Sequence, residues 1–452
     1  MLENVHQGVS TFLNAGGLYI APLEYQGYRE EILASKTSAW VGTPLNESPI
    51  YDVEGPDAAR FLTSLCVNNF MKMKVGSIRH AIMCNDKGQM LTDGVVMKIA
   101  ENHFRTYWLM PIVDFHMSTT DMDVKGTDLS GTEFFIQVAG PRSLEILEHA
   151  SASDLHDIKF AAHRTVIFSG VEVRVLRLGM AGSLAYELHG PMGQLDAVFK
   201  SIWDVAEPLG ASKLGRMAYL LNHTEGGFAN IFIHFPMPWF EERNLAEYCL
   251  TQPMALFFNY NRQLVGSMGD ELESRFKTPY DVGWGSLVRF DHDFPGRAAL
   301  ERIADNPPNT MVTLEWNADD VGEIVASQYR GRDAVAYEPI DDRPSDNYFV
   351  NPNGFHYHSD KVMFEGTTIG SSTGRIRSVY YKRMISLGFI QCEHAVEGKQ
   401  LTLLWGKPGG PQKEVRVTVA RTPYMDLANN KDIDVNTIPR LLAREDAGAT
   451  IS

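Results

Sequence analysis

The sequence predicts an α+β fold with several domains, the last of which is rich in β-strands. The chain has 452 residues, whereas a single domain usually has about 100–200. Up to Glu301, runs with strand-like alternation are interspersed with runs of helical spacing. The segment Asp305-Asn306-Pro307-Pro308-Asn309 then breaks the pattern, and mostly β-prone runs follow it. We therefore expect a domain boundary near this segment.

Turn and capping residues delimit the first expected elements. Gly55-Pro56-Asp57 follows a short strand, Ile50–Val53, and opens a helix from Ala58 to Cys66, because Pro and Asp suit the first helical turn. Asn85-Asp86-Lys87-Gly88 is a turn signal, so the β-prone runs on its two sides form a hairpin. These two runs are Ile78–Cys84 and Gln89–Ile99.

The same reasoning gives the remaining elements. Val171–Leu178 alternates apolar and charged residues as a half-buried strand does. The other expected elements before the break are a strand at Phe134–Val138 and helices at Ser143–His149 and Leu195–Ala206. After the break the expected strands are Met311–Trp316, Met384–Ile390, Gln400–Trp405 and Glu414–Val419.

Composition excludes several classes of function. The formal net charge of −15 argues against nucleic acid or an anionic membrane as the main partner, because phosphates are bound by clustered Lys and Arg. No apolar run reaches the ~18 residues of a membrane span, and Met1–Ser10 lack the basic start of a secretory signal. No two of the four cysteines form a C-x-x-C pair, so we expect no zinc site, no disulfide framework and a cytoplasmic protein.

Cofactor motifs are also missing. His356 and His358 would share a face on a strand, which makes a metal site conceivable. No third ligand accompanies them, so we interpret them as polar residues of a surface loop and expect no metal. No G-x-G-x-x-G motif follows a first strand, so we expect no nicotinamide or flavin.

Several segments resemble, in the same order, the glycine cleavage T-protein (aminomethyltransferase) family. The hairpin that carries Asp93 resembles the aspartate-bearing hairpin of that family, and Tyr186-Glu187 resembles its Tyr-Glu-Ile segment. The resemblance extends from about Arg29 to Asp426, and it implies a three-domain cloverleaf around a central folate-binding cavity, with a β-barrel-like C-terminal domain. Further matching segments are Gly283-Trp284-Gly285, Phe290–Leu300, Gly370–Gly374 and Ile385–Ile390.

The resemblance also implies a division of the chain. Residues 1–49 and 126–305 form a first, split domain that binds folate. Residues 50–125 form a second, inserted α+β domain. Residues 306–430 form the β-rich C-terminal domain, and residues 431–452 form a peripheral tail.

Within the family, Gly215–Gly227 resembles most the tetrahydrofolate-dependent aromatic O-demethylases of the vanillate, 3-O-methylgallate and syringate type. Those demethylases have Tyr where the T-protein has Arg, and this chain has Tyr219. The resemblance implies a methyltransferase of one-carbon metabolism. It would move a methyl group from a methoxylated aromatic compound, of the kind released from lignin, to N5 of tetrahydrofolate. The products are a phenol and 5-methyltetrahydrofolate.

Tyr219 is the expected proton donor. A phenoxide is a poor leaving group unless it is protonated as it forms, and a tyrosine has a pKa of ~10, close to that of the leaving phenol. Taken alone, the residue is better explained as a core tyrosine whose OH bonds a backbone carbonyl. The position in the family favours the catalytic role.

Carboxylates are the expected ligands of the folate. Asp93, in a strand-like run where Asp is disfavoured, resembles the aspartate near the reactive nitrogens of folate, where it would stabilise developing positive charge. Glu187 would accept two N–H donors of the pterin in parallel; a solvent-facing glutamate is the alternative. The resemblance further implies Tyr186, Asn222 and Glu225 as cofactor-binding residues.

The substrate side departs from the demethylases. Phe228 stands where the vanillate enzyme has a substrate-contacting Trp, and Tyr19 matches an N-terminal tyrosine of that pocket. Leu109 stands where that enzyme has an Arg for the substrate carboxylate, and the segment Val41–Ser48 lacks its histidines. An acid group could instead be held by Arg375, Arg377 or Lys382, or the methyl donor could be neutral.

Two other functions stay open. A demethylase of a methylated amine or sulfonium compound would release a neutral leaving group that needs no proton, so Tyr219 argues against it. A non-catalytic folate-binding protein is disfavoured because both Asp93 and Tyr219 are present. The sequence leaves the methyl donor and the oligomeric state open.

Overall fold

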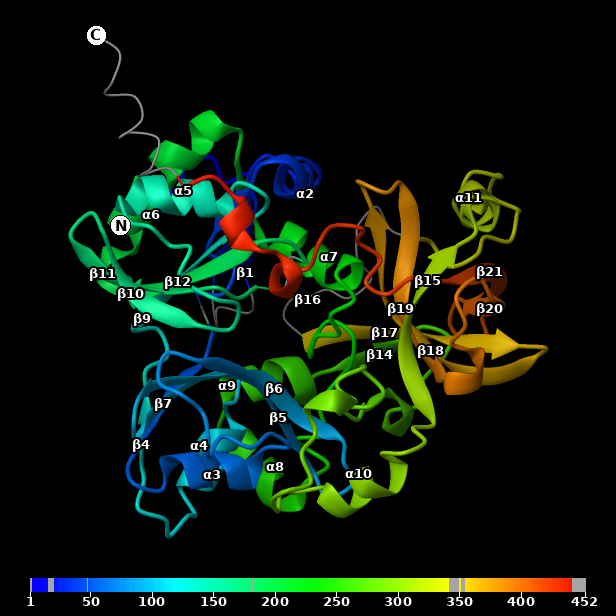
Figure 1. Cartoon of the computed structure of the whole chain (residues 1–452). Helices are drawn as coiled ribbons and strands as arrows, with labels where there is room; N and C mark the ends of the chain where they lie inside the picture. The colour runs from blue at the N-terminus through cyan, green and yellow to red at the C-terminus, as the bar shows by residue number, and fades with distance from the viewer. Residues whose placement is uncertain are drawn as a thin grey trace.

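Three β-sheets, each in its own lobe, organise the chain (Figure 1). The structure is a computed structural model that describes residues 2–440, apart from residues 15–19, 47, 180–181, 341–348 and 351–353. Helix α7 (Arg216–Glu225) lies between the first lobe and the third, and it packs against elements of both.

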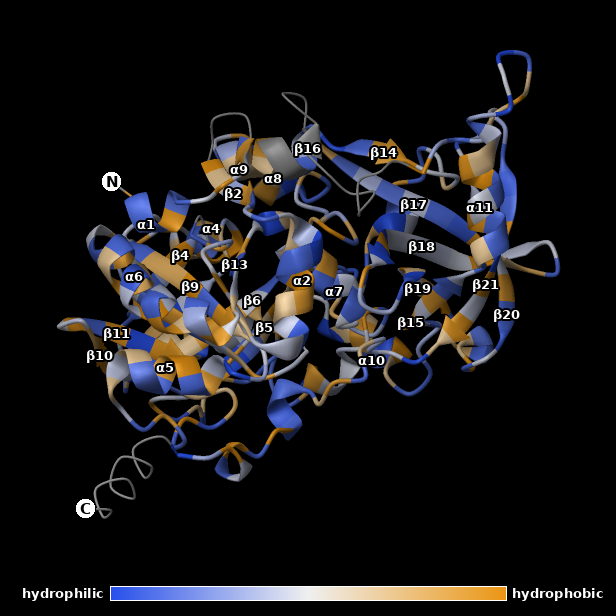
Figure 2. Ribbon diagram, turned by 90° about the horizontal axis from the view of Figure 1, so that it is seen from above, coloured by the Kyte–Doolittle hydropathy of each residue, from blue (hydrophilic) through white to orange (hydrophobic). Residues whose placement is uncertain are grey.

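The first lobe contains a six-stranded sheet in the order β10-β11-β12-β9-β3-β13. Helices α5 (Ser143–Ser151) and α6 (Leu195–Ala206) cover one face of it and bury an apolar cluster. Polar and apolar residues both appear on α6 in Figure 2, as expected for a helix with one buried face. The strands are β3 (Trp40–Gly42), β9 (Glu133–Ala139), β10 (His163–Phe168), β11 (Val171–Leu176), β12 (Ala185–Pro191) and β13 (Ser212–Leu214).

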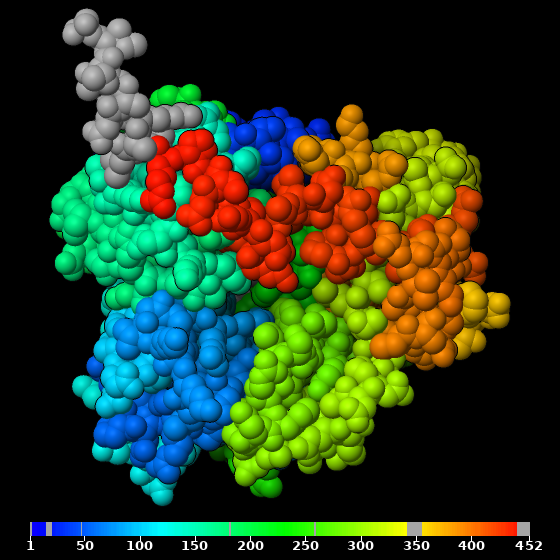
Figure 3. All heavy atoms as spheres, viewed as in Figure 1, coloured from blue at the N-terminus to red at the C-terminus, as the bar shows by residue number. Residues whose placement is uncertain are grey.

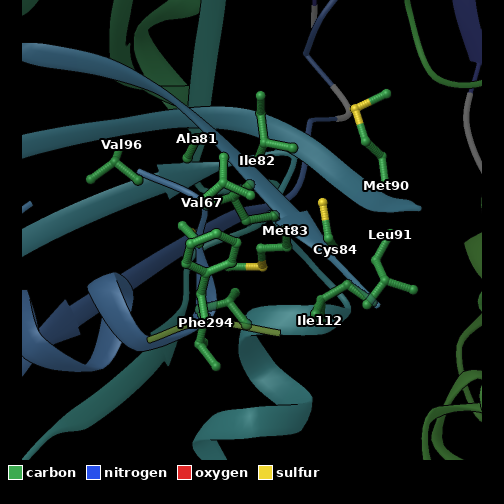
Figure 4. Close-up of a cluster of buried hydrophobic side chains, with 14 of the residues drawn as sticks. Val67, Ala81, Ile82, Met83, Cys84, Met90, Leu91, Val96, Ile112 and Phe294 are labelled. Carbon is green, nitrogen blue, oxygen red and sulfur yellow. The ribbon is translucent and has the colours of Figure 1, made fainter. Parts of the chain in front are cut away.

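The second lobe contains a five-stranded antiparallel sheet in the order β5-β6-β7-β4-β8. Its apolar cluster, shown in Figure 4, also includes side chains from the segment 229–300, such as Phe294. The elements of this lobe are β4 (Ile50–Glu54), α3 (Ala58–Leu65), β5 (Ile78–Cys84), β6 (Met90–Ala100), β7 (His103–Tyr107), α4 (Ile112–Met117), β8 (Lys125–Asp128), α8 (Arg243–Cys249) and α10 (Arg297–Ile303).

The third lobe is a closed six-stranded β-barrel. The sheet runs β17-β18-β19-β15-β21-β20 and closes because β17 also pairs with β20. A further strand, β14 (Gln263–Val265), pairs with β17 in parallel. The other elements are β15 (Asn309–Trp316), α11 (Ala318–Ser327), β16 (Phe349–Val350), β17 (Gly354–Phe364), β18 (Thr367–Ser378), β19 (Arg383–Gln391), β20 (Gln400–Trp405) and β21 (Lys413–Ala420).

The remaining elements are short, and the last segment of the chain links the barrel to the first lobe. Residues 421–440, red in Figure 3, run from the barrel across to the first lobe, where Val435 is buried in the apolar cluster. These elements are α1 (Glu3–His6), β1 (Thr11–Asn14), β2 (Ile20–Glu24), α2 (Tyr28–Thr37), α9 (Pro253–Ala255), a π-helix (Leu256–Tyr260), and short 3-10 helices at 192–194, 207–209, 273–275, 285–287, 392–394, 430–432 and 435–437.

The α+β class and the C-terminal barrel are confirmed, and every strand and helix expected above is present with small shifts at its ends. The interpretation of His356 and His358 as surface-loop residues is wrong. Both lie on β17, and His358 is buried, with Nε2 2.8 Å from Asp360 Oδ2 and its ring stacked on Trp405. In the described ranges, no helix is long and apolar enough to cross a membrane.

The packing suggests a different division of the chain near two boundaries. The sequence assigned residues 126–305 to the first domain, but the segment 229–300 shares its apolar cluster with strands of the second lobe. Residues 431–440, assigned to a peripheral tail, pack on the first lobe. We therefore propose to draw the second domain as residues 50–125 with 229–303, and to include residues 431–440 in the first.

Candidate active site

A pocket lies between the first-lobe sheet and helix α7. It encloses about 240 Å³, part of which is open to solvent. Its walls come from the face of the sheet that α5 and α6 do not cover, and α7 closes the other side. The lining residues are Trp40, Gln137, Ala139, Gly179, Ala185, Tyr186, Glu187, Tyr219 and Asn222.

Tyr219 lies in the first turn of α7 and is 6% exposed. Burial raises the pKa of its phenol well above 10, and the Glu187 and Asp93 carboxylates raise it further. Arg216 and a hydrogen bond from Gln137 act in the opposite direction. Tyr219 therefore stays protonated at neutral pH, because burial and the charges of two carboxylates disfavour its phenolate.

Glu187 lies directly opposite Gln137 on paired strands β12 and β9. The Gln137 amide donates to Glu187 Oε1 at 3.2 Å. His189 Nε2 lies 3.6 Å from Glu187 Oε2, and His189 Nδ1 lies 2.9 Å from the Tyr107 hydroxyl. The carboxylate is thus fixed from two sides while it still lines the pocket.

Tyr186 and Glu187 face opposite sides of the sheet, because neighbouring strand residues alternate. The Tyr186 ring is completely buried in the cluster under α5 and α6, so the structure does not bring its side chain to Glu187. Asn222, one turn after Tyr219 on α7, does line the pocket.

Glu225 lies at the end of α7, outside the pocket lining. Its Oε2 pairs with Lys36 Nζ at 3.0 Å, and its Oε1 accepts from Ser378 Oγ at 2.7 Å. Because these contacts join three elements, we place Glu225 outside the proposed site.

Asp93 lies on β6, and its Oδ2 is 2.8 Å from His80 Nε2 on the neighbouring strand β5. Asp93 is 7% exposed, and its Oδ1 is buried without a hydrogen-bond partner among the described residues. A buried carboxylate oxygen normally has a donor, so this atom is the strongest mark of a ligand position on the second lobe.

Aromatic rings connect Tyr219 to this pair. The His223 ring packs edge-on against Tyr219 at 4.8 Å and lies 6.2 Å from Phe228. Phe228 lies 5.8 Å from His80 and 5.1 Å from Trp284, and Trp284 packs edge-on against His80 at 4.6 Å. Phe228 thus forms part of an aromatic corner beside Asp93.

The other substrate candidates are placed differently. Leu109 is fully buried in the apolar cluster of the second lobe. Tyr19 lies outside the described residues. Arg377 donates to the Tyr28 hydroxyl at 2.6 Å, Arg375 lies over the Trp405 ring, and Lys382 is exposed. None of these three cations lines the pocket.

Sequence reasoning missed His80, Gln137, His189, Trp284 and Trp40. Trp40 lines the pocket, and its buried Nε1–H has no acceptor in the described part of the chain. Gln137 could have been found only from the β9–β12 register. His80 depends on a β-bulge between Met83 and Cys84, which shifts the hairpin register by one residue and brings His80 to the face of Asp93.

One group elsewhere has the composition of a metal site. Glu148, Asp154 and His156 lie close together in the first lobe. His156 Nδ1 is 2.8 Å from Glu148 Oε1, and its Nε2 is 3.1 Å from the Ile438 carbonyl. Both ring nitrogens are engaged in hydrogen bonds, so the group anchors residues 431–440 to the first lobe.

Comparisons with known proteins show the family of the chain. Residues 11–232 match the family described as the GCVT N-terminal domain. The chain is 54% identical to a sesamin methylene transferase of Sinomonas sp. (strain No.22), over 97% of this chain and 98% of that protein. It is 28% identical to a syringate O-demethylase of Sphingobium sp. (strain NBRC 103272 / SYK-6), over 90% of each.

Solved structures give the same fold. Glycine cleavage system aminomethyltransferase T from Bartonella henselae matches with a TM-score of 0.65 at 16% identity, covering 95% of this chain and 98% of that one. The chain belongs to the glycine cleavage T-protein (GCVT) family and is an enzyme of that family.

Proposed function

We propose that this methyltransferase moves a one-carbon unit from an aromatic ether to N5 of tetrahydrofolate. With a methoxylated aromatic substrate the products are a phenol and 5-methyltetrahydrofolate. The observation that carries the proposal is the protonated Tyr219, buried in a pocket beside Glu187. Similarity to a syringate O-demethylase over 90% of the chain supports the same reaction.

The unpaired polar atoms suit a pterin. The unpaired Asp93 Oδ1 atom offers an acceptor and the unpaired Trp40 Nε1–H offers a donor, and the Glu187 carboxylate, held by Gln137, lines the pocket as a further acceptor. A pterin carries adjacent N–H donors and a carbonyl acceptor, so it can satisfy both kinds of group, and a carboxylate can accept two such donors in parallel. When bound, tetrahydrofolate supplies the nitrogen that accepts the carbon.

Tyr219 has the role of the acid. It donates its phenolic proton to the ether oxygen as the carbon leaves, so that no free phenoxide forms. Burial raises the pKa of Tyr219, and the same surroundings raise the pKa of a phenol released beside it. The two groups therefore stay matched in acidity inside the pocket.

Asp93 and His80 have the role of proton acceptor. A secondary amine that gains a carbon must lose its proton, and the free Oδ1 of Asp93 is a buried acceptor for it. His80 holds Asp93 through Oδ2 and fixes the direction of Oδ1. The proton donor, Tyr219 on α7, and the proton acceptor, Asp93 on the second-lobe strand β6, thus lie on different parts of the molecule.

A second candidate substrate is a methylenedioxyarene, in which one methylene bridges two ring oxygens. The 54% identity to a methylene transferase favours it. Transfer of the methylene breaks two C–O bonds and leaves a catechol, one ring with two phenolic hydroxyl groups. The two protons that they need equal the two N–H protons that N5 and N10 of the folate give up.

The test is to incubate the enzyme with tetrahydrofolate and methoxyarenes, methylenedioxyarenes, methylamines or sulfonium acids. Mass spectrometry then identifies the folate product. We expect 5-methyltetrahydrofolate from a methoxyarene or 5,10-methylenetetrahydrofolate from a methylenedioxyarene, with the matching phenol. Turnover of the amines or sulfonium compounds alone would overturn the proposal.

A further inference from the structure

A second pocket lies between the barrel and the segment that precedes the second-lobe helix α10. It encloses about 210 Å³, part of which is open to solvent. Buried strand residues of β17, β18 and β19 form one wall, and Arg275 and Lys277 form the other. The lining residues are His234, Pro236, Arg275, Lys277, Tyr357, His358, Ser359, Ser371, Thr373 and Phe389.

Lys277 is the unusual residue of this pocket. Its side chain is 6% exposed, and its ammonium donates to the Ser274 carbonyl at 2.7 Å and lies over the Phe389 ring. Within the described ranges, no carboxylate forms an ion pair with it. Burial lowers the pKa of Lys277 to about 8, which leaves it mostly charged at neutral pH.

The neighbouring acids do not neutralise Lys277. Asp281 has the largest attractive effect on it, but the Asp281 carboxylate accepts from Thr278 and Asn309. Asp360 accepts from the Ser267 amide and lies 2.8 Å from His358. A buried ammonium without a counter-charge costs several kcal/mol, so a ligand that brings a negative charge would be favoured here.

The rest of the lining adds positive charge and hydroxyl groups. Arg275 is 3% exposed, and its guanidinium bonds the carbonyls of residues 265, 269, 271 and 357, which holds it at the pocket wall. Burial lowers the pKa of His234 to about 3, so His234 is neutral. Ser359, Ser371 and Thr373 present small polar side chains from β17 and β18.

We propose that this second pocket binds a carboxylate through Lys277. The glutamate tail of the folate is one source of that group, which rests on the proposed function, and a free carboxylic acid is the other. The position of the second pocket relative to the first supports the glutamate tail of the folate as the source. Tyr219 and Asn222 of α7 line the first pocket, and Thr224 of the same helix lies 3.1 Å from His234 Nε2 in the second. The helix is only ~15 Å long, so the two pockets lie close together along it.

The experiment compares tetrahydrofolate with tetrahydropteroate, which lacks the glutamate, by calorimetry under anaerobic conditions. A charge-assisted hydrogen bond predicts that the wild-type protein binds tetrahydrofolate about 10-fold more tightly. In Lys277→Met this preference disappears because only the tetrahydrofolate affinity falls. Lys407→Met, which removes an exposed lysine of the barrel, keeps the preference.

A second arm tests the other source. L-Glutamate alone should raise the melting temperature of the wild type but not that of Lys277→Met if a free acid occupies the pocket. Equal binding of both pterins together with no effect of L-glutamate would overturn the carboxylate site. If neither pterin binds the wild type, the proposed folate function is wrong. The L-glutamate measurement then still shows whether the second pocket binds a carboxylate. Should Lys277→Met not fold, Lys277→Gln serves for the same comparison.

Discussion

At Tyr219 the protein holds a phenol in its protonated form, because burial and two carboxylates disfavour the phenolate. Tyr219→Phe keeps the ring and its packing and removes only the proton. We expect turnover to fall by ~10²–10⁴, the range for a lost general acid, with little change in melting temperature. Steady-state kinetics with a series of ring-substituted aryl ethers measures this.

The leaving group supplies the control for Tyr219. Ring-nitrated ethers release a more acidic phenol, so the defect of Tyr219→Phe should shrink with them. A defect of equal size across the series would show that Tyr219 positions the substrate and does not protonate it. Full activity of the variant would remove Tyr219 from the mechanism and favour a sulfonium or amine compound as the methyl donor.

The role of Asp93 can be tested against a second aspartate in the same hairpin. Asp93→Asn keeps the shape of the side chain and removes the charge, and the loss in rate should be ~10²–10³. The control is Asp86→Asn, because Asp86 is exposed in the turn of the same hairpin. Single-turnover rates at saturating folate separate the effect on chemistry from the effect on binding. Wild-type rates for Asp93→Asn would remove Asp93 from the mechanism.

Part of this site could be predicted from the sequence. The resemblance pointed to Glu187, Tyr219 and Asn222, which line the pocket, and to Asp93, which lies beside His80, because each lies in a short motif. It also pointed to Tyr186, a lining residue whose ring packs in the apolar cluster under α5 and α6. His80 could not be predicted, because its place beside Asp93 depends on a bulge that no local pattern signals.

At the scale of the element, strand β6 requires a glycine next to Asp93. A Cβ at Gly94 would lie 2.0 Å from the Tyr107 carbonyl oxygen and 3.0 Å from Leu109 Cδ2. Gly94→Ala must therefore push β6 away from β7, and we expect a loss of about 1–3 kcal/mol in the free energy of unfolding and a misplaced Asp93. Gly193→Ala, where a Cβ meets nothing within 4 Å, is the control in urea unfolding. Equal stability of the two variants would contradict the tight approach.

The N-terminus of helix α7 is held by a buried glutamate, Glu31, whose pKa is raised. Glu31 of α2 accepts from the Gly215 amide at 2.8 Å and from the Tyr25 amide at 2.7 Å. Burial raises the pKa of Glu31 to about 7, against the effect of these amides. A raised pKa means that the folded state keeps a proton that the unfolded state has already lost, so stability falls as pH rises from about 4.5 to about 7.

Glu31→Gln removes that titration. We expect the wild type to lose up to ~1.4 kcal/mol per pH unit relative to Glu31→Gln across this window, and no more above it. Urea unfolding of both proteins between about pH 5 and pH 8 measures the difference. Parallel pH profiles of the two proteins would show that Glu31 ionises normally in the folded state.

Most of the elements themselves followed from local signals. The hairpin at Asn85–Gly88 and the helix at Leu195–Ala206 were predictable because turn residues and apolar spacing are encoded in neighbouring positions. Barrel closure was predictable only from the family resemblance and not from local patterns, since the β17–β20 pairing joins strands far apart in the chain. The packing of segment 229–300 on the second lobe was not predictable from local patterns either, because it brings together residues far apart in the chain.

At the scale of the whole molecule, a buried ion pair joins the first lobe to the barrel. Lys36 of α2 and Glu225 of α7 are 3.0 Å apart with side chains 2% and 1% exposed, and Ser378 of β18 donates to the same carboxylate. Burying two charges is costly, so the pair contributes little net stability by itself. Removing one partner leaves the other charge buried alone.

Lys36→Met should therefore destabilise the protein by about 3–5 kcal/mol, and Glu225→Met should do the same. The double variant should recover most of this loss, because it leaves no unpaired charge at the junction. Urea unfolding of the four proteins gives the coupling energy of the pair. Since α7 carries Tyr219, the single variants should also lose turnover at temperatures where they remain folded, and the double variant should regain it. Strictly additive losses in stability would show that the two charges do not interact.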